Sequence, residues 1–206
     1  MKLLRLLIAA LIGTALIAGN AATAQSPDVK ITMRTFEVVS LFRAPPWSTG
    51  PDVMAQSELS RQQGKSAKGT DVFIWELIPK GEDFSGWSEL YAIMAETPLG
   101  GTAQDYRNGV FNLYSNNCDG AKMQPLVEHS EQQIFALFCP AYRSDSKTGE
   151  IAVMNYHMHR KTLVKHYYHK RGAAFTLDDQ DSWPMTEDEF AAMIERIGAL
   201  ETKPAK

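Results

Sequence analysis

Four of the chain's five histidines are crowded into one short segment that is rich in residues typical of β-strands. The four are His157, His159, His166 and His169. They divide between two extended runs, 151–159 and 163–170, which are separated by three polar residues. This arrangement predicts a β-hairpin. Neutral imidazole is a common protein ligand for zinc and copper, so the hairpin is the first place to look for chemistry.

The register of the hairpin decides which histidines can meet. Alternate residues of a strand share a face, so His157 and His159 point the same way. If residues 160–161 form a two-residue turn, His166 lies on that face as well, and the three imidazoles form a candidate zinc or copper site. A three-residue loop would bring His169 to the pair instead. The alternative without chemistry is that these are strand residues packed beside neighbouring tyrosines, because the hairpin contains no carboxylate to orient a metal-bound histidine.

The same hairpin is basic, although the chain as a whole is slightly acidic. Its cations are Arg160, Lys161, Lys165, Lys170 and Arg171, and no acidic residue occurs from 151 to 177. The whole chain has 21 Lys and Arg against 24 Asp and Glu, a formal net charge of −3. We therefore predict a local positive surface that binds an acidic protein or an anionic envelope surface, with an ordinary solvated surface as the alternative. The overall acidic balance argues against a nucleic-acid binder.

An enzyme would need a base, an acid and a place for its substrate. Secreted nucleases can work with two histidines and a lysine, and His157, His166 and Lys165 could take those roles. The chain contains no Gly-x-Ser-x-Gly elbow, no His-Glu-x-x-His motif and no Gly-rich phosphate loop. We therefore expect a binding protein without an obligatory cofactor, and keep a secreted hydrolase of nuclease type as an alternative.

The first 24 residues have the layout of a secretory signal peptide. Two basic residues precede an apolar run at 6–19, and the small-residue triplet at 22–24 is typical of a cleavage site. Cleavage before Gln25 leaves residues 25–206, which suit a single globular domain. The apolar run is shorter than the roughly 20 residues that a membrane-spanning helix needs. We therefore expect a mature protein that does not span the membrane and that resides in the periplasm or is secreted.

The chain has only two cysteines, Cys118 and Cys139, and export places them in an oxidising compartment. We predict that they form a disulfide. Closing a loop of about 20 residues would stabilise the fold by roughly 3 kcal/mol in the chain-entropy account. A reactive thiol or a metal pair is the alternative, although no Cys-x-x-Cys spacing supports it.

Hydrophobic periodicity predicts several further strands and two helices. Strands are expected at 28–42, with a bend near Thr35, and at 72–78, 87–95, 123–128 and 133–141, in addition to the hairpin. The apolar residues of 87–95 also fit a helix turn, which is the alternative for that segment. Capping boxes at Thr102-x-x-Asp105 and Thr186-x-x-Glu189 predict that one helix begins at each. Residues 43–70 are rich in Pro, Gly, Ser and Gln and are expected to form a long loop, with a short helix at 51–62 as the alternative for that part. Residues 201–206 are expected to form a frayed tail.

This order of elements predicts an α+β domain in which a mostly antiparallel sheet of about six or seven strands is covered by two main helices. Several scattered features add a resemblance: Ile78-Pro79-Lys80-Gly81 followed by Trp87, a helix ending at a cysteine, a strand carrying a second cysteine, and Gly149-Glu150 opening paired strands. Together they resemble uncharacterised exported bacterial proteins with a PsbP-like sandwich, over roughly residues 71–200. The resemblance implies a fold and no activity, because such domains serve as accessory units. We therefore expect an exported accessory or binding domain that acts by protein or envelope-surface interaction.

Overall fold

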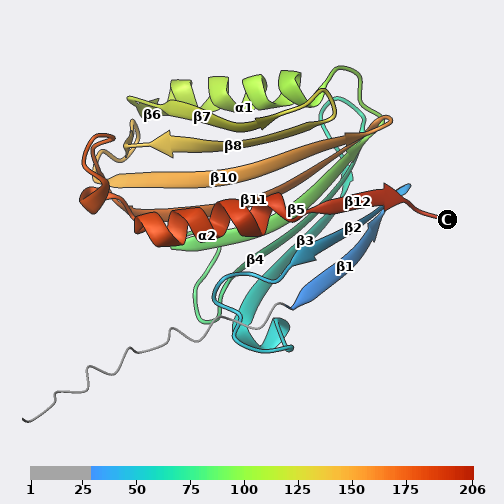
Figure 1. Cartoon of the computed structure of the whole chain (residues 1–206), viewed down its shortest axis with the longest axis horizontal. Helices are drawn as coiled ribbons and strands as arrows, with labels where there is room; N and C mark the ends of the chain where they lie inside the picture. Colours follow the sequence, from blue (N-terminus) through green and yellow to red (C-terminus); the bar gives the residue numbers. More distant parts are fainter. Residues whose placement is uncertain (1–28) are drawn as a thin grey trace, which may run out of the picture.

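The computed structural model describes residues 29–206 and is built on a seven-stranded antiparallel sheet (Figure 1). In spatial order the strands are β3 (Ser57–Lys65), β4 (Asp71–Pro79), β5 (Glu89–Thr97), β11 (Thr162–Ala173), β10 (Thr148–His159), β8 (Gln132–Cys139) and β7 (Lys122–Glu128). The predicted antiparallel sheet of six or seven strands is confirmed. The predicted signal peptide, residues 1–24, and its cleavage site lie outside the described residues.

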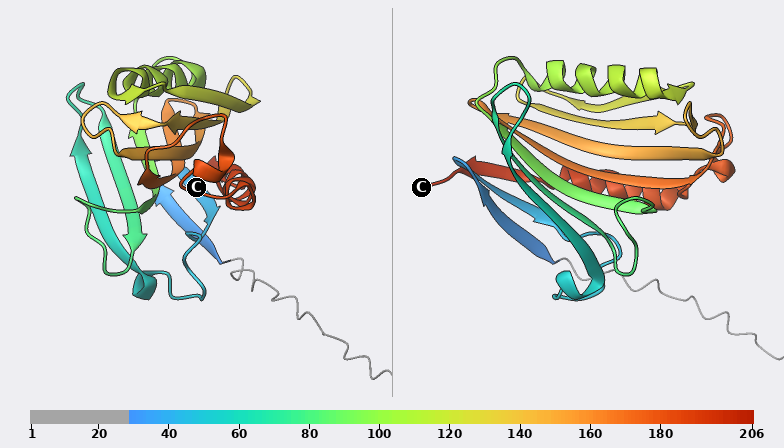
Figure 2. Two further views of the ribbon diagram at one scale, coloured as in Figure 1. Left: turned by 90° about the vertical axis from the view of Figure 1, so that its left-hand side faces the viewer. Right: turned by 180° about the vertical axis from the view of Figure 1, so that it is seen from behind.

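Each face of this sheet is covered by a different layer, as Figure 2 shows. On one face, α1 (Ala103–Asn117) packs mainly on β7, β8 and β10. On the other face lie α2 (Glu187–Gly198) and a second sheet. The second sheet consists of β1 (Lys30–Thr35), β2 (Val38–Arg43) and β12 (Glu201–Pro204). The expectation that two helices cover the sheet is therefore only partly met, because the second sheet shares one face with α2.

We name the two faces of the large sheet after these helices. The α1 face carries Ala152 and Met154, and the α2 face carries Ile151 and Val153, because successive residues of a strand point to opposite sides. The larger apolar cluster lies on the α2 face, and a second cluster lies under α1. The remaining short elements are β6 (Cys118–Asp119), β9 (Ala141–Tyr142) and two 3-10 turns, Met54–Gln56 and Gln180–Ser182.

Both helices begin at the predicted capping boxes. The Asp105 amide donates to Thr102 Oγ1 at 3.2 Å, and the Thr102 amide donates to Asp105 Oδ2 at 2.7 Å. Thr186 and Glu189 make the same exchange, at 3.2 and 2.8 Å. The exchange satisfies amide groups that the first turn of a helix leaves without partners, which is why both starts could be predicted.

The histidine hairpin forms with the two-residue turn that the sequence suggests. His159 pairs with Thr162, and Asn155 pairs with His166. Arg160 occupies the turn with a φ of 55°, in the left-handed region that tight hairpin turns use. The register that places His157, His159 and His166 on one face is therefore confirmed.

The segment 43–70, expected to be a long loop, contains the nine-residue strand β3. β3 lies at the edge of the sheet, and its side chains from 61 to 65 are exposed. An edge strand that faces water does not need the apolar alternation that marks a half-buried strand. Its polar composition therefore hid it from sequence analysis.

Both ends of the described chain also differ from expectation. The single strand expected at 28–42 is a hairpin of β1 and β2, with Phe36 in the turn at a φ of 53°. The tail expected to fray at 201–206 forms β12, which pairs with β2. Pairing between segments so far apart in the sequence leaves no local signal. No helix within residues 29–206 is long and apolar enough to cross a membrane.

The predicted disulfide between Cys118 and Cys139 is present, with the two Cα atoms 5.3 Å apart. It joins the end of α1 to β8 across 21 residues of sequence. We expect replacement of both cysteines by alanine to lower the free energy of unfolding by about 3 kcal/mol, because the open loop gives the unfolded chain more conformational freedom. Urea denaturation of the double variant measures this loss, and an unchanged midpoint would contradict it.

Candidate functional site

The three histidines predicted as metal ligands share the α2 face, where the second layer covers them. His166 is fully buried, its Nε2 lies 2.7 Å from Tyr91 Oη, and its Nδ1 lies 3.4 Å from the Ile197 carbonyl oxygen. His166 is therefore held by β5 and α2. Its environment is that of a core residue that links these two elements.

The other two members of the trio also have separate surroundings. His157 Nδ1 lies 2.7 Å from Thr202 Oγ1 of β12, and His159 Nε2 is buried without a hydrogen-bond partner. Within residues 29–206, no group of three or more His, Cys, Asp or Glu side chains is placed to hold a metal ion. The geometry gives the predicted zinc or copper site no support.

The three residues considered for a nuclease site, His157, His166 and Lys165, do not lie on the same face of the sheet. Lys165 lies on the α1 face, whereas His157 and His166 lie on the α2 face. The thickness of the sheet separates the lysine from both imidazoles. Lys165 and His166 are adjacent in the chain, but neighbouring positions of a strand point in opposite directions.

The five basic residues of the hairpin do not form one surface. Lys165 and Arg171 lie on the α1 face, and Arg160 and Lys161 are exposed at the turn. Lys170 lies on the opposite face, where its Nζ is 3.0 Å from Glu189 Oε1. The predicted positive patch is thus divided among two faces and a turn. The strand periodicity that separates the cations also places two of them beside a cavity.

A groove of about 510 Å³ opens on the α1 face. It exists because α1 covers β7, β8 and β10 and leaves β11, β5 and β4 open beside it. Strand β11 contributes four alternate side chains to it: Lys165, Tyr167, His169 and Arg171. Its apolar lining comes from Trp87, Leu90, Met94, Val110, Leu113 and Met154.

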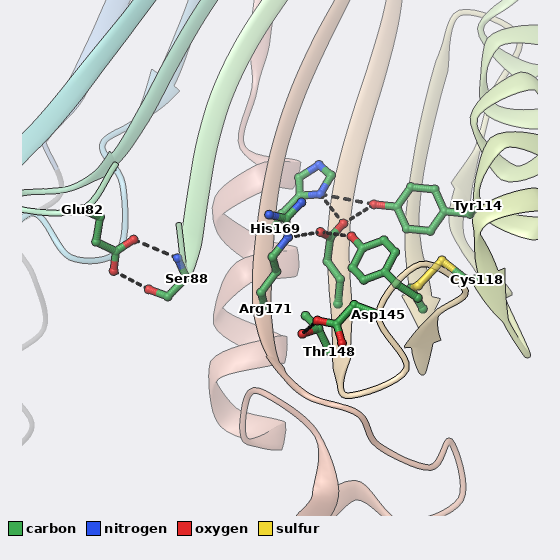
Figure 3. A network of polar contacts seen from close by, with 11 residues as sticks. Glu82, Ser88, Tyr114, Cys118, Asp145, Thr148, His169 and Arg171 are labelled. Atoms are coloured by element: carbon green, nitrogen blue, oxygen red, sulfur yellow. Dashed lines mark hydrogen bonds and ion pairs between the residues drawn. A yellow bond between two sulfur atoms is a disulfide. The ribbon is translucent and has the colours of Figure 1, made fainter. Parts of the chain in front are cut away.

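The groove lining includes one buried carboxylate, Glu150. Figure 3 shows the side chains of Tyr114, His169 and Arg171, which surround it. Glu150 is 2% exposed and accepts hydrogen bonds from four side chains. Its Oε1 accepts from the Tyr114 hydroxyl and from His169 Nδ1 at 2.7 Å. Its Oε2 accepts from the Tyr142 hydroxyl and from Arg171 Nε at 2.9 Å. Four donors satisfy both oxygens of a carboxylate, so the network is complete without a ligand.

The electrostatics of the network keep this carboxylate ionised. Burial alone raises the pKa of Glu150, but the interaction with His169 and the hydroxyls of Tyr114 and Tyr142 outweigh it and lower the pKa to about 2. Burial, followed by the charge of Glu150, raises the pKa of both tyrosines above that of free tyrosine. At neutral pH the site therefore combines a charged carboxylate with protonated phenols.

Arg171 is the member of the network that reaches furthest toward solvent. Its Cζ lies 3.5 Å from the centre of the Trp87 ring and 5.7 Å from that of Tyr142. The side chain is 32% exposed. Trp87, Tyr142 and Arg171 also line a second cavity of about 570 Å³, whose other walls are mostly small and polar. The guanidinium thus stands where the two cavities meet.

Two further charged groups line the apolar part of the groove. Lys165 Nζ lies 5.6 Å from the centre of the Tyr156 ring, and burial lowers the pKa of the amine, with Glu96 acting in the opposite direction. Burial also raises the pKa of Glu76, although the Tyr167 hydroxyl, 3.4 Å from Glu76 Oε1, opposes this. Both shifts favour the neutral forms, the free amine of Lys165 and the protonated carboxyl of Glu76.

Sequence analysis missed most of this site. In the sequence, Tyr114 is one aromatic residue of a predicted helix, and Glu150 only marks the start of paired strands. The signal that could have revealed the groove is the run Lys165-x-Tyr167-x-His169-x-Arg171. These polar and aromatic residues share one face of β11, an inner strand that pairs with β10 and β5. Polar residues along one face of an inner strand indicate that this face is not packed against an apolar core.

No protein-family model matches the chain, and no curated protein matches it in sequence closely enough to show a relationship. The function must therefore be argued from the groove itself.

Proposed function

We propose that this protein is an exported, non-enzymatic binding domain whose ligand site is the groove beside α1. The observation that carries the proposal is the pairing of an open apolar groove with a buried, fully hydrogen-bonded carboxylate at its end. Binding sites for small molecules are typically apolar clefts of several hundred cubic ångströms with a few polar groups in fixed positions. Glu150 supplies that fixation, because it holds His169 and Arg171 in place before any ligand arrives.

The disulfide supports an exported location, because such bonds persist in oxidising compartments. We place the mature protein in the periplasm or outside the cell, as the signal-like N-terminus suggests. Its partner is then a molecule of the cell envelope or its surroundings. The relationship to PsbP-like exported proteins stays a prediction, and the proposed role does not depend on it.

A neutral apolar dye tests whether the groove binds ligands. N-phenyl-1-naphthylamine is expected to bind the wild-type protein and to gain fluorescence. Leu113→Gln should weaken this binding about fivefold, because it removes about 1 kcal/mol of apolar contact from the groove wall. Leu113 is 58% exposed, so the change should leave the fold intact.

Leu59→Gln is the matched control. Leu59 is a similarly exposed leucine, at 42%, but it lies on the edge strand β3 outside the groove. Its replacement should leave dye binding unchanged. Equal weakening by both variants, or no binding to the wild type, would exclude the groove as the ligand site.

A further inference from the structure

The apolar groove and the polar cavity beside it meet at Trp87, Tyr142 and Arg171. The groove is lined mainly by aliphatic and aromatic side chains, whereas the lining of the polar cavity includes Ser85, Ser88, Ser144 and Thr148. A molecule that lies across the junction would contact apolar side chains at one end and hydrogen-bonding groups at the other. The shape of the site thus favours an amphipathic ligand.

The charges at the junction favour an acidic head group. Glu150 is satisfied by four donors, so it offers nothing to a cation, whereas Arg171 uses only Nε to contact it. Arg171 also hydrogen-bonds with Tyr142, but a guanidinium carries five N–H donors, so donors remain for a further anion. A guanidinium matches a carboxylate or phosphate in geometry and charge. The Trp87 ring, whose centre is 3.5 Å from Arg171 Cζ, packs against the guanidinium.

The carboxylate in the polar cavity does not cancel this preference. Asp145 is engaged within its own turn, where Oδ2 accepts from Thr148 Oγ1 at 2.6 Å and Oδ1 from the Lys147 amide at 3.2 Å. These hydrogen bonds stabilise the ionised carboxylate, lower the pKa of Asp145 and hold its oxygens within the turn. Arg171 is therefore the group that faces a head placed at the junction.

The groove also has the length for an extended chain. From Arg171 to Lys165 the strand advances six residues, or about 20 Å at the usual rise of a β-strand. Between these ends the groove is lined by Tyr167, Leu90 and Met94, which offer aromatic and aliphatic contact. Lys165 stands at the far end as a second cation. This layout suits one narrow chain better than a compact ring system.

We propose that the ligand is a single-chain amphiphile with an acidic head, bound with its head at Arg171 and its apolar chain along β11 toward Lys165. The inference rests on the proposed function, because it specifies the chemistry of the same groove. A free fatty acid and a single-chain phosphate ester share this chemistry.

Calorimetric titration with four dodecyl compounds below their micelle concentrations tests the proposal. Dodecanoate and dodecyl phosphate are expected to bind the mature protein at least tenfold more tightly than dodecanol, and dodecyltrimethylammonium should bind no better than the alcohol. Whichever acid binds more tightly identifies the head group, and either result supports the proposal. Equal binding of acids and alcohol would overturn the acidic head while leaving the groove as a ligand site.

Variants locate the head group. Arg171→Gln should reduce the preference for acid over alcohol at least tenfold. Lys170→Gln is the matched control, because it removes the same charge from the next position of β11 on the opposite face and should leave the preference unchanged. If Arg171→Gln does not fold, Arg171→Lys keeps the charge beside Glu150 and should still weaken acid binding, since an ammonium cannot form the forked pair.

The remaining outcomes separate this inference from the proposed function. Loss of acid preference in Lys165→Gln but not in Arg171→Gln would overturn the placement of the head. Failure of every dodecyl compound, with naphthylamine binding intact, would overturn the amphiphile alone. Failure of both classes of ligand would overturn the proposed function as well. Binding to phosphatidylglycerol vesicles without binding of the free acids would assign the acid recognition to a membrane surface and overturn the proposal.

Discussion

Replacing Glu150 with alanine is expected to lower the free energy of unfolding by about 3 to 5 kcal/mol. The carboxylate is buried and accepts from His169 Nδ1, Arg171 Nε and the hydroxyls of Tyr114 and Tyr142. Its removal takes away the acceptor that the four donors share, and one of these donors is a guanidinium in a partly buried position. The cost of such orphaned donors exceeds the net value of the hydrogen bonds themselves. Urea denaturation at pH 7 measures the loss.

Two variants show whether the loss comes from the network. Tyr142→Phe removes one hydrogen bond and leaves three, so it should cost about 1 kcal/mol. Glu82→Ala removes a carboxylate that also accepts two hydrogen bonds, from the Ser88 amide at 2.8 Å and from its hydroxyl at 2.5 Å, but near the surface (Figure 3). We expect this control to cost about 1 kcal/mol or less. A Glu150→Ala protein as stable as the Glu82→Ala protein would show that the buried network does not stabilise the fold.

The features that sequence analysis predicted correctly are those with local causes. The helix starts at Thr102 and Thr186 follow from side chains that bond within their own first turn. The hairpin register follows from a two-residue turn, and the disulfide follows from the count of cysteines and the expected compartment. Each of these conclusions needs only residues that are close in the chain or a chemical rule without geometry.

The features that it missed depend on which layer covers which face. Period-two patterns show that His157 and His166 share a face, but they do not show that β12 and α2, from the far end of the chain, cover it. In the same way, the Glu150 network draws its members from α1, β9, β10 and β11. Long-range packing of this kind leaves no mark in the local pattern of Tyr114 or Glu150, so both looked like ordinary structural residues.

The buried imidazole of His166 should make the fold labile to acid. Burial lowers the pKa of His166 from 6.5 to about 3; the Ile197 carbonyl opposes this shift and the charge of Arg196 adds to it. The Tyr91 hydroxyl donates to the Arg43 carbonyl at 2.6 Å, and its oxygen lies 2.7 Å from His166 Nε2. The folded state therefore holds the neutral imidazole.

The sign of the pH dependence follows from these two pKa values. Between pH 6.5 and about 3 the unfolded chain binds a proton at His166 that the folded chain does not, so stability falls as the pH falls through this window. Above pH 6.5 His166 is neutral in both states, so its contribution to the free energy of unfolding is fully present. Uptake of one proton on unfolding predicts that the free energy of unfolding falls by about 2 kcal/mol between pH 6.5 and 5, and by roughly 5 kcal/mol over the whole window. Glu150 adds a further loss only at lower pH, between 4.5 and about 2, as its carboxylate is protonated.

Urea midpoints at pH 7.5, 6 and 5 separate His166 from Glu150, because these pH values lie above the window of Glu150. The wild-type midpoint should fall steadily, whereas that of His166→Gln, which keeps a donor toward Tyr91 but does not titrate, should change far less. His157 acts in the same direction, since burial lowers its pKa too, but it is only half-buried and should account for the remainder. His129→Gln, in an exposed turn, should keep the wild-type slope. A His166→Gln protein that still lost about 2 kcal/mol between pH 6.5 and 5 would show that other groups cause the acid lability, because the slope measures protons taken up on unfolding.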